Sequence, residues 1–403
     1  MTTVDSSLQA QVDAQLLEQG AFAPLELLFN SGRLLYSDYE GWRRREIELL
    51  DSALMGNTDN IKAEIEQAVS YAKRIGLVEQ AQEFHPWQTP GAPHAGRGER
   101  PLRISMDAQL QRLIASRYIR SQNVPQMDLF FDNPVVALTN GIVAALTARN
   151  LEGAQRQLDQ LYTQAPTHTD LAAFDQLLAA LGHLGHPVED PRPELVFLLE
   201  VTPTARRLLG GQWRDLLAPL WRQLAVALEG VAFNPEEPDL HRSFAFGQAQ
   251  DWSAVSDAVL REPNWQRYAP LCLRLTESAF NRRRRIEALA AWCHVCWRAP
   301  AAAAEAANKL RQPELATLWQ RFLDEEALTE VDFPAWLLLR EPGLVLQLAE
   351  DLAPGETIPE EHYRLVHRCI QARRARRQDE EIRARKALQA ANPALFQLLK
   401  QSV

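Results

Sequence analysis

Cysteine and histidine side chains are the first candidates for chemistry in this chain. Cys293 and Cys296 lie three residues apart, with His294 between them. On a helix the two thiols would share one face, where a cysteine pair can bind zinc or cycle through a disulfide. Two ligands do not complete a structural zinc site, and the other cysteines, Cys272 and Cys369, are single. Because tryptophans flank the motif on both sides, we interpret it as core packing and predict no metal site.

The remaining polar motifs do not form a pattern typical of catalysis. His183 and His186 are three residues apart, but glycines and a proline interrupt the helix around them, which indicates a helix end. The Glu360-Glu361-His362 string lacks the second histidine of a metalloprotease helix. Gly210-Gly211 is not followed by Gly-Lys-Ser/Thr, so we interpret it as a helix stop. We predict no catalytic residue and no cofactor, and an enzyme with residues dispersed over several helices stays open as an alternative.

Arginines gather in two places where they could contact phosphate or acidic partners. Arg282–Arg285 are four consecutive cations, and a second group lies near the C-terminus, at Arg364, Arg368, Arg373, Arg374, Arg376 and Arg377. Successive residues of a helix point in different directions, and Glu380 and Glu381 are close enough to pair with the second group. We interpret both groups as solvated, self-neutralised helix faces. A nucleic-acid interface at the C-terminal arginines is the alternative.

The composition of the chain is typical of a helical protein in a reducing compartment. Leu, Ala, Gln, Glu and Arg are abundant, and β-branched residues are few. Four cysteines in 403 residues do not make a disulfide framework. The sequence shows no pattern of a secretory signal and no apolar run long enough to span a bilayer. We expect a cytoplasmic protein without membrane association, whose net charge of -9 opposes broad binding to phosphate backbones.

Helical spacing of apolar residues predicts an N-terminal helical module over residues 1–83. Its helices are expected over 8–28 and 60–77. Tyr39 and Trp42 lie three residues apart on another expected helix, and we interpret them as core residues rather than a ligand platform.

Prolines and glycines crowd residues 84–103, where we predict a linker or loop because their density excludes both helix and sheet. We place the main domain boundary there. The remainder, residues 104–403, has helical spacing nearly throughout and begins with an expected helix over 107–119. Eight tryptophans in this part are expected to fill the gaps between packed helices, and exposure of Trp265 or Trp336 as a binding anchor is the alternative.

Two helical stripes in Val135–His168 predict an antiparallel hairpin of helices. Apolar or small residues recur on the first helix at Leu138, Gly141, Ile142 and Ala145, and on the second at Ala154, Leu158 and Leu161. Arg149-Asn150 supplies the turn, and Pro166 stops the second helix. This segment resembles the tetratricopeptide repeat, a helical hairpin of about thirty-four residues in which a small residue opens the second helix and a proline closes the unit.

The resemblance implies a concave surface, formed by the first helix of each hairpin, that holds an extended peptide or a partner helix. In this chain the residues of that surface would be Val136, Thr139, Val143 and Leu146. They are mostly apolar, so coverage by another helix of the same chain is an equal alternative to an open groove.

We therefore expect an all-α protein: an irregular tetratricopeptide-like solenoid of helical hairpins preceded by an N-terminal helical module, with an irregular helical bundle as the alternative. The expected function is non-catalytic, that of an adaptor, scaffold or chaperone-like factor which binds a protein or peptide. A nucleic-acid-associated helical protein and an enzyme with a dispersed site are the alternatives.

Overall fold

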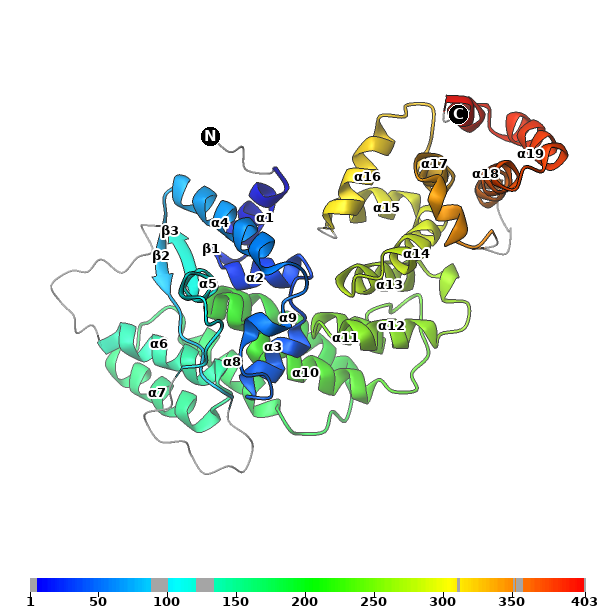
Figure 1. The fold of residues 1–403 in the computed structure, drawn as a ribbon. Helices are drawn as coiled ribbons and strands as arrows, with labels where there is room; N and C mark the ends of the chain where they lie inside the picture. Colours follow the sequence, from blue (N-terminus) through cyan, green and yellow to red (C-terminus); the bar gives the residue numbers. More distant parts are fainter. Residues whose placement is uncertain are drawn as a thin grey trace. The chain divides into compact units, whose positions relative to one another are not determined.

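The structure is a computed structural model that describes residues 6–87, 101–120, 134–309, 312–350, 352 and 358–401. Helices make up 71% of the chain and strands 3%, so the expected all-α class is confirmed at the level of secondary structure (Figure 1). The chain divides into two compact units, Met1–Asp251 and Trp252–Val403. This division falls at a different point from the boundary predicted at 84–103. None of the helices in the described part of the chain is both long and apolar enough to cross a membrane.

The N-terminal part of the first unit combines short helices with a small sheet. In chain order its elements are α1 (Ser6–Gln19), β1 (Ala21–Phe22), α2 (Pro24–Asn30), α3 (Tyr36–Arg43), α4 (Thr58–Arg74), β2 (Leu77–Ala81), α5 (Ala108–Ile114) and β3 (Ser116–Arg120). Asn57 caps α4 by accepting a hydrogen bond from the Asn60 amide, and Gly76, with a φ of 86°, follows its last turn. Tyr39 and Trp42 are buried, as predicted.

The sheet is antiparallel, in the order β1-β3-β2, and was not expected from the sequence. Phe22 pairs with Tyr118, and Glu79 pairs with the same residue from the other side. The helix predicted over 107–119 is therefore wrong beyond Ile114. The reason is that Tyr118 follows Leu110 and Ile114 at intervals of four, so a helical spacing continues into this five-residue strand, in which the neighbouring residues Tyr118 and Ile119 are both buried.

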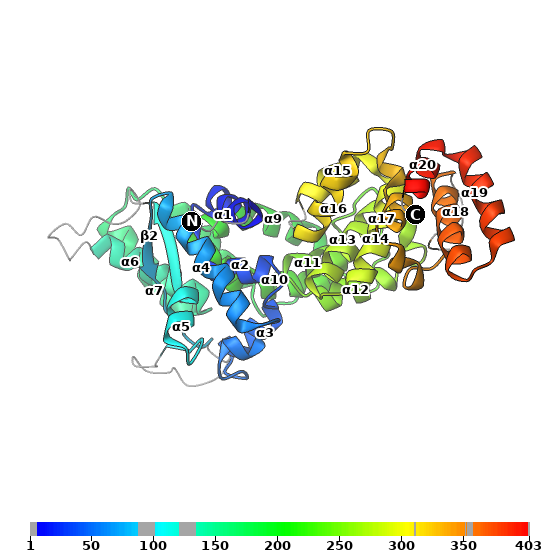
Figure 2. The same ribbon diagram turned by 45° about the horizontal axis from the view of Figure 1, so that its top comes forward.

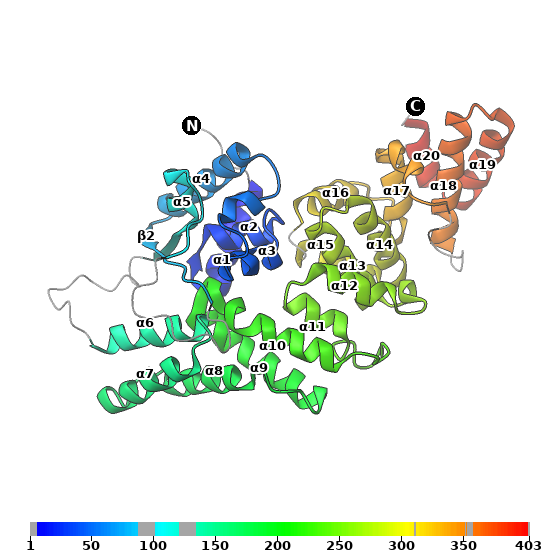
Figure 3. The same ribbon diagram turned by 60° about the horizontal axis from the view of Figure 1, so that its bottom comes forward.

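Six further helices complete the first unit, and consecutive ones pack against each other (Figures 1 and 3). They are α6 (Pro134–Thr147), α7 (Leu151–Gln164), α8 (Leu171–His183), α9 (Pro191–Leu209), α10 (Trp213–Ala227) and α11 (Arg242–Gln248). Gly141 of α6 faces α7 so closely that a Cβ there would overlap the amide of Gln157. Gly210 ends α9 with a φ of 55°, as the predicted helix stop requires.

The second unit is built only of helices over its described residues (Figure 2). They are α12 (Trp252–Leu260), α13 (Ala269–Asn281), α14 (Arg285–Arg298), α15 (Pro300–Lys309), α16 (Pro313–Leu323), α17 (Phe333–Arg340), α18 (Ile358–Arg374), α19 (Gln378–Ala391) and α20 (Pro393–Gln401), with short 3₁₀ turns η4 (Trp265–Arg267), η5 (Glu330–Asp332) and η6 (Pro342–Leu346). Trp292, Trp319 and Trp336 are buried in one core with phenylalanines, which confirms the core role expected for them.

One turn geometry recurs at three helical hairpins, α6–α7, α13–α14 and α18–α19. In each, an arginine adopts a left-handed backbone conformation, at Arg149, Arg283 and Arg376, with φ between 57° and 59°. The next amide then donates to an alanine carbonyl five residues earlier, from Asn150, Arg284 and Arg377 to Ala145, Ala279 and Ala372. This hydrogen bond is that of a Schellman cap, which satisfies an end carbonyl and reverses the chain.

Candidate functional site

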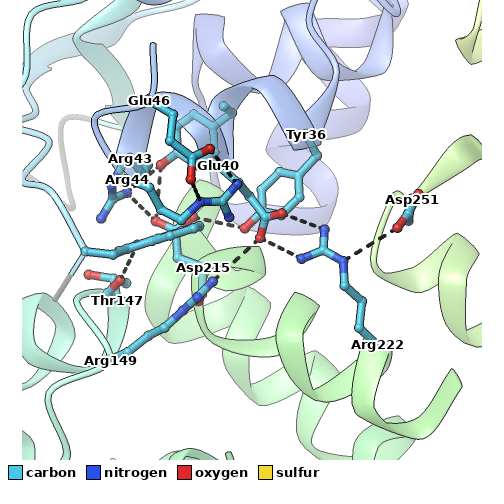
Figure 4. Close-up of polar contacts among 12 residues, drawn as sticks. Tyr36, Glu40, Arg43, Arg44, Glu46, Thr147, Arg149, Asp215, Arg222 and Asp251 are labelled. Carbon is cyan, nitrogen blue, oxygen red and sulfur yellow. Dashed lines mark hydrogen bonds and ion pairs between the residues drawn. The ribbon is translucent and has the colours of Figure 1, made fainter. Parts of the chain in front are cut away.

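A set of buried charged and polar groups lies in the first unit, where α3 meets α10 and the α6–α7 turn (Figure 4). We call it the buried ionic cluster: Tyr36, Tyr39, Glu40, Arg43, Trp87, Arg149, Asp215 and Arg222. The four residues from α3 follow at intervals of three, one and three, so they share one face of that helix. Asp215 and Arg222 are seven residues apart on α10 and also share a face.

Asp215 is the centre of one half of the cluster. Its Oδ2 lies 2.6 Å from Arg43 Nη1, and the two side chains are only 2% and 3% exposed. Tyr39 donates to Oδ2 at 3.2 Å and Tyr36 to Oδ1 at 3.3 Å. Arg149 donates from Nε to the backbone carbonyl of Asp215 at 2.8 Å. The aspartate is thus satisfied by three side chains, which is what a carboxylate far from water requires.

Glu40 is the centre of the other half. Arg222 contacts it through two nitrogens, Nη1 to Oε1 at 2.8 Å and Nη2 to Oε2 at 2.7 Å. Arg149 Nη2 approaches Oε1 at 3.7 Å, and Asp251 lies 3.8 Å from Arg222 Nε (Figure 4). Such a two-nitrogen contact fixes orientation as well as distance, so α3 is held to α10 in one register.

Trp87 lies between two of the arginines. The Arg149 guanidinium carbon is 3.7 Å from the centroid of the indole ring, and that of Arg43 is 5.1 Å away. The backbone amide of Trp87 donates to the Arg43 carbonyl at 2.9 Å, and its indole nitrogen donates to the Thr147 carbonyl at 3.1 Å. The ring therefore attracts both cations through its face while its edge binds α6.

Burial and charge act on the pKa values of this cluster in opposite directions. Burial raises the pKa of Asp215, while Arg43 and Arg149 act to lower it. Burial lowers the pKa of Arg149. Burial also opposes the charge of Arg43, but Tyr39 and Asp215 outweigh it and leave the pKa of Arg43 above its ordinary value. Burial raises the pKa of Tyr36, whose hydroxyl therefore acts as a hydrogen-bond donor.

The geometry makes the cluster a fastening point between helices. Each of its carboxylates contacts arginines of the same chain, and the contacts join α3, the α6–α7 turn and α10. A further buried pair, Arg214 with Glu26, joins α10 to α2 at 2.5 Å. Sequence reasoning missed this cluster, although Tyr36, Glu40 and Arg43 on the face that also carries Tyr39 could have indicated a polar core.

The cysteine motif lies in the core of the second unit. All four cysteines are fully buried and none forms a disulfide: Cys272, Cys293, Cys296 and Cys369. Burial raises the pKa of all four thiols, to about 12 for Cys272 and about 11 for Cys369. The interpretation as core packing is confirmed. Among the described residues no group of three potential ligands could hold a metal ion.

His183 and His362 each contact a carboxylate of their own unit. His183 ends α8, as predicted, and its Nδ1 lies 3.2 Å from Glu194. His362 is buried with its Nδ1 3.1 Å from Asp332 Oδ1, and Asn392 donates to that same oxygen at 3.1 Å. Asp332 therefore joins η5 to α18 and to the end of α19.

The C-terminal arginines contact carboxylates of their own unit. Arg364 pairs with Glu361, Arg368 with Glu350, Arg373 with Glu381 and Arg377 with Glu380, at 2.5 to 3.3 Å. Arg374 and Arg376 are exposed. A hollow of about 480 Å³ between α18 and α19 is lined by Arg368 and Arg377 together with both of their partner glutamates. These contacts agree with the interpretation of a self-neutralised face.

The surface implied by the resemblance is only partly open in the structure. Val136 is 38% exposed, and Thr139 and Val143 are half-buried. Leu146 is fully buried, so it does not belong to an open surface, and at this residue the alternative of coverage by the chain itself holds. The reason is that Leu146 lies in the last turn of α6, next to the α6–α7 turn that Arg149 ties to α10.

The chain matches no family model, no curated protein and no solved structure. The fold and the site therefore define only a coarse class: a helical protein of two compact units, the first of which contains a buried ionic cluster that holds helices together. What the protein does has to be argued from its own residues.

Proposed function

We propose that this protein is a non-catalytic binding protein, an adaptor, scaffold or chaperone-like factor built on tetratricopeptide-like hairpins, and that α6 contributes the surface for a protein or peptide partner. The observation that carries the proposal is the exposure of an uncharged, apolar helix. From Pro134 to Thr147 the sequence contains no charged residue, yet buried residues begin only at Ile142.

Contiguous apolar surface that is exposed on a monomer commonly marks an interaction site. Val136 and Ala137 are exposed in the first turns of α6, and Val135 and Leu138 beside them are half-buried. Ile142, Ala145 and the residues after them anchor the other end of the helix in the core. A partner could therefore cover the start of α6 without unfolding the hairpin.

The three similar hairpins support the comparison with repeat proteins. Besides the shared turn, their second helices α7, α14 and α19 all have 14 residues. Two residues after each of these helices there is a proline, at Pro166, Pro300 and Pro393. The residue seven positions before each left-handed arginine is buried, at Ile142, Thr276 and Cys369. The residue twelve positions after it is buried as well, at Leu161, Val295 and Leu388. Repeats of this kind stack into arrays whose faces bind other proteins.

The polar sites support binding more than catalysis or nucleic-acid contact. The carboxylates and arginines of the buried ionic cluster bind one another, and most of the C-terminal arginines are paired with glutamates. Phosphate contacts would have to displace those glutamates, which weakens the nucleic-acid alternative.

A photo-crosslinking experiment tests the proposal. A benzophenone amino acid replaces Val136 in the full chain, and crosslinked proteins from native cells are identified and purified. We expect a purified partner to bind the wild type and to lose at least tenfold in affinity with Val136→Glu, because a buried unpaired carboxylate is costly. Leu17→Glu is the matched control, since Leu17 is 86% exposed on α1 and lies outside this surface. Equal loss with both variants, or no crosslink at position 136, contradicts the proposal.

A further inference from the structure

A hollow of about 680 Å³ lies between the end of α8 and the start of α9. Its apolar lining comes from Pro187, Val188, Pro193 and Phe197. Its polar lining contains Glu189 and Glu194 together with two histidines and Asp190. Along α9 the apolar surface continues to Val196 and Leu199, which are 54% and 43% exposed.

The loop that forms this hollow is held in place by one glutamine from α10. Gln223 accepts from the Gly185 amide at 3.0 Å and donates to the carbonyl of His186 at 2.9 Å. It also donates to the His183 carbonyl at 3.3 Å. Gly185 has a φ of 87°, a conformation that side chains rarely adopt, so the loop depends on this glycine. The hollow is thus shaped before any ligand arrives, which lowers the entropic cost of binding.

Three carboxylates line the hollow, those of Glu189, Asp190 and Glu194. Glu189 lines the hollow and is exposed, and the Glu194 side chain is only 14% exposed, with His183 as its neighbour. No lysine or arginine is among the residues that line the hollow, all of which the structure describes. The nearest cation in sequence, Arg192, pairs instead with Glu237 at 2.8 Å. A cation placed at the hollow would therefore meet carboxylates, with His183, 3.2 Å from Glu194, as the basic side chain in contact with one of them.

We propose that this hollow binds a peptide segment of a partner protein in which a large apolar side chain lies next to a lysine or arginine. The apolar side chain contacts Val188, Pro193 and Phe197, which line the hollow, and the cation contacts Glu189 and Glu194. This inference rests on the proposed binding function and adds to it the chemistry of the partner.

Selection from a library of short peptides displayed on phage, against the immobilised full chain, tests the inference. We expect enrichment of peptides with Lys or Arg beside Leu, Phe or Trp. The most enriched peptide, made synthetically, should bind at least tenfold more weakly to Glu189→Lys than to the wild type, by calorimetric titration. Its affinity should also fall with added salt. Glu48→Lys, the same charge change at an exposed site of the same unit, should leave the affinity unchanged.

Three results would overturn the inference. The first is enrichment of peptides without cations, and the second is equal binding to Glu189→Lys and to the wild type. The third is a difference in self-association between Glu189→Lys and the wild type, measured by sedimentation. Such a difference would mean that a second copy of this chain occupies the hollow. If an enriched peptide responds to Val136→Glu but not to Glu189→Lys, the hollow is not the site and the proposed binding function stands. If no peptide is enriched and no partner crosslinks at position 136, both fail.

Discussion

Replacing one buried arginine should destabilise the first unit strongly, whereas replacing its neighbour in sequence should not. Arg43→Met removes the contact of 2.6 Å with Asp215, the contact with Tyr39 and the hydrogen bond of 2.9 Å to the His85 carbonyl. Asp215 then stays buried without a cation at its carboxylate. Removal of one partner of a buried ion pair costs about 3–5 kcal/mol.

Arg44→Met is the matched control. Arg44 pairs with Glu46 at 2.8 Å, but the two side chains are 46% and 60% exposed (Figure 4). Exposed pairs contribute about 0–1 kcal/mol. At about 2–4 °C per kcal/mol for a unit of this size, Arg43→Met should lower the melting temperature by roughly 6–20 °C and Arg44→Met by at most roughly 4 °C. Scanning calorimetry of the full chain measures both.

The deficit of the Arg43→Met variant should depend on pH. Burial raises the pKa of Asp215, and the loss of the arginine charge raises it further. A carboxyl group whose pKa is raised by folding contributes stability that is fully present below its unfolded pKa, and it loses that contribution as the pH rises through its folded pKa. The deficit should therefore be largest near neutral pH and should shrink towards pH ~4. Equal melting temperatures for the two arginine variants, or a deficit that grows on acidification, would refute this reasoning.

Three further predictions concern single features. Trp87→Phe keeps an aromatic ring, although a smaller one, but loses the donor to the Thr147 carbonyl, so urea denaturation should show a loss of about 1–2 kcal/mol, and an unchanged midpoint would contradict the role of that bond. Cys272 and the other three cysteines are buried with raised pKa values, so a thiol reagent should react with none of them in the native protein and with all four after unfolding; fast native labelling would disprove their burial. The hydrogen bond from Arg112 lowers the pKa of Glu79 to about 2, and Glu79→Gln should cost at most about 1 kcal/mol near neutral pH. Because a lowered pKa stabilises only above the unfolded pKa, that cost should vanish as the pH falls towards the folded value, and a cost that persists in acid would count against the pair.

The helices were predictable because their apolar residues recur every three or four positions over several turns. The hairpin at α6–α7 followed from this spacing together with the turn at Arg149-Asn150 and the stop at Pro166. The sheet could not be predicted, since β1 has two residues and β3 has five, and such short runs carry no distinct period. Its strands are also far apart in the sequence, so their pairing is a tertiary contact that no local pattern encodes.

The buried ionic cluster was missed for a different reason. A charged residue on a helix is expected to face solvent, but Arg43 and Asp215 are buried because each has a partner of opposite charge on another element. The partner of Arg43 is 172 residues away in the chain. By contrast, the recurrence of an arginine turn followed by a proline seventeen residues later was present in the sequence, at Arg149, Arg283 and Arg376. It was hidden because the residues between vary.

The order β1-β3-β2 has a consequence for synthesis of the chain on the ribosome. The central strand is the last of the three to be made, so β1 and β2 have no partner until Ser116–Arg120 has emerged. Each later hairpin, such as α6–α7 or α18–α19, closes between helices that are adjacent in the chain. Loop closure over about a hundred residues is slower than contact between neighbouring helices. The N-terminal end of the protein, although made first, should therefore be among the last parts of its unit to reach the native state during synthesis.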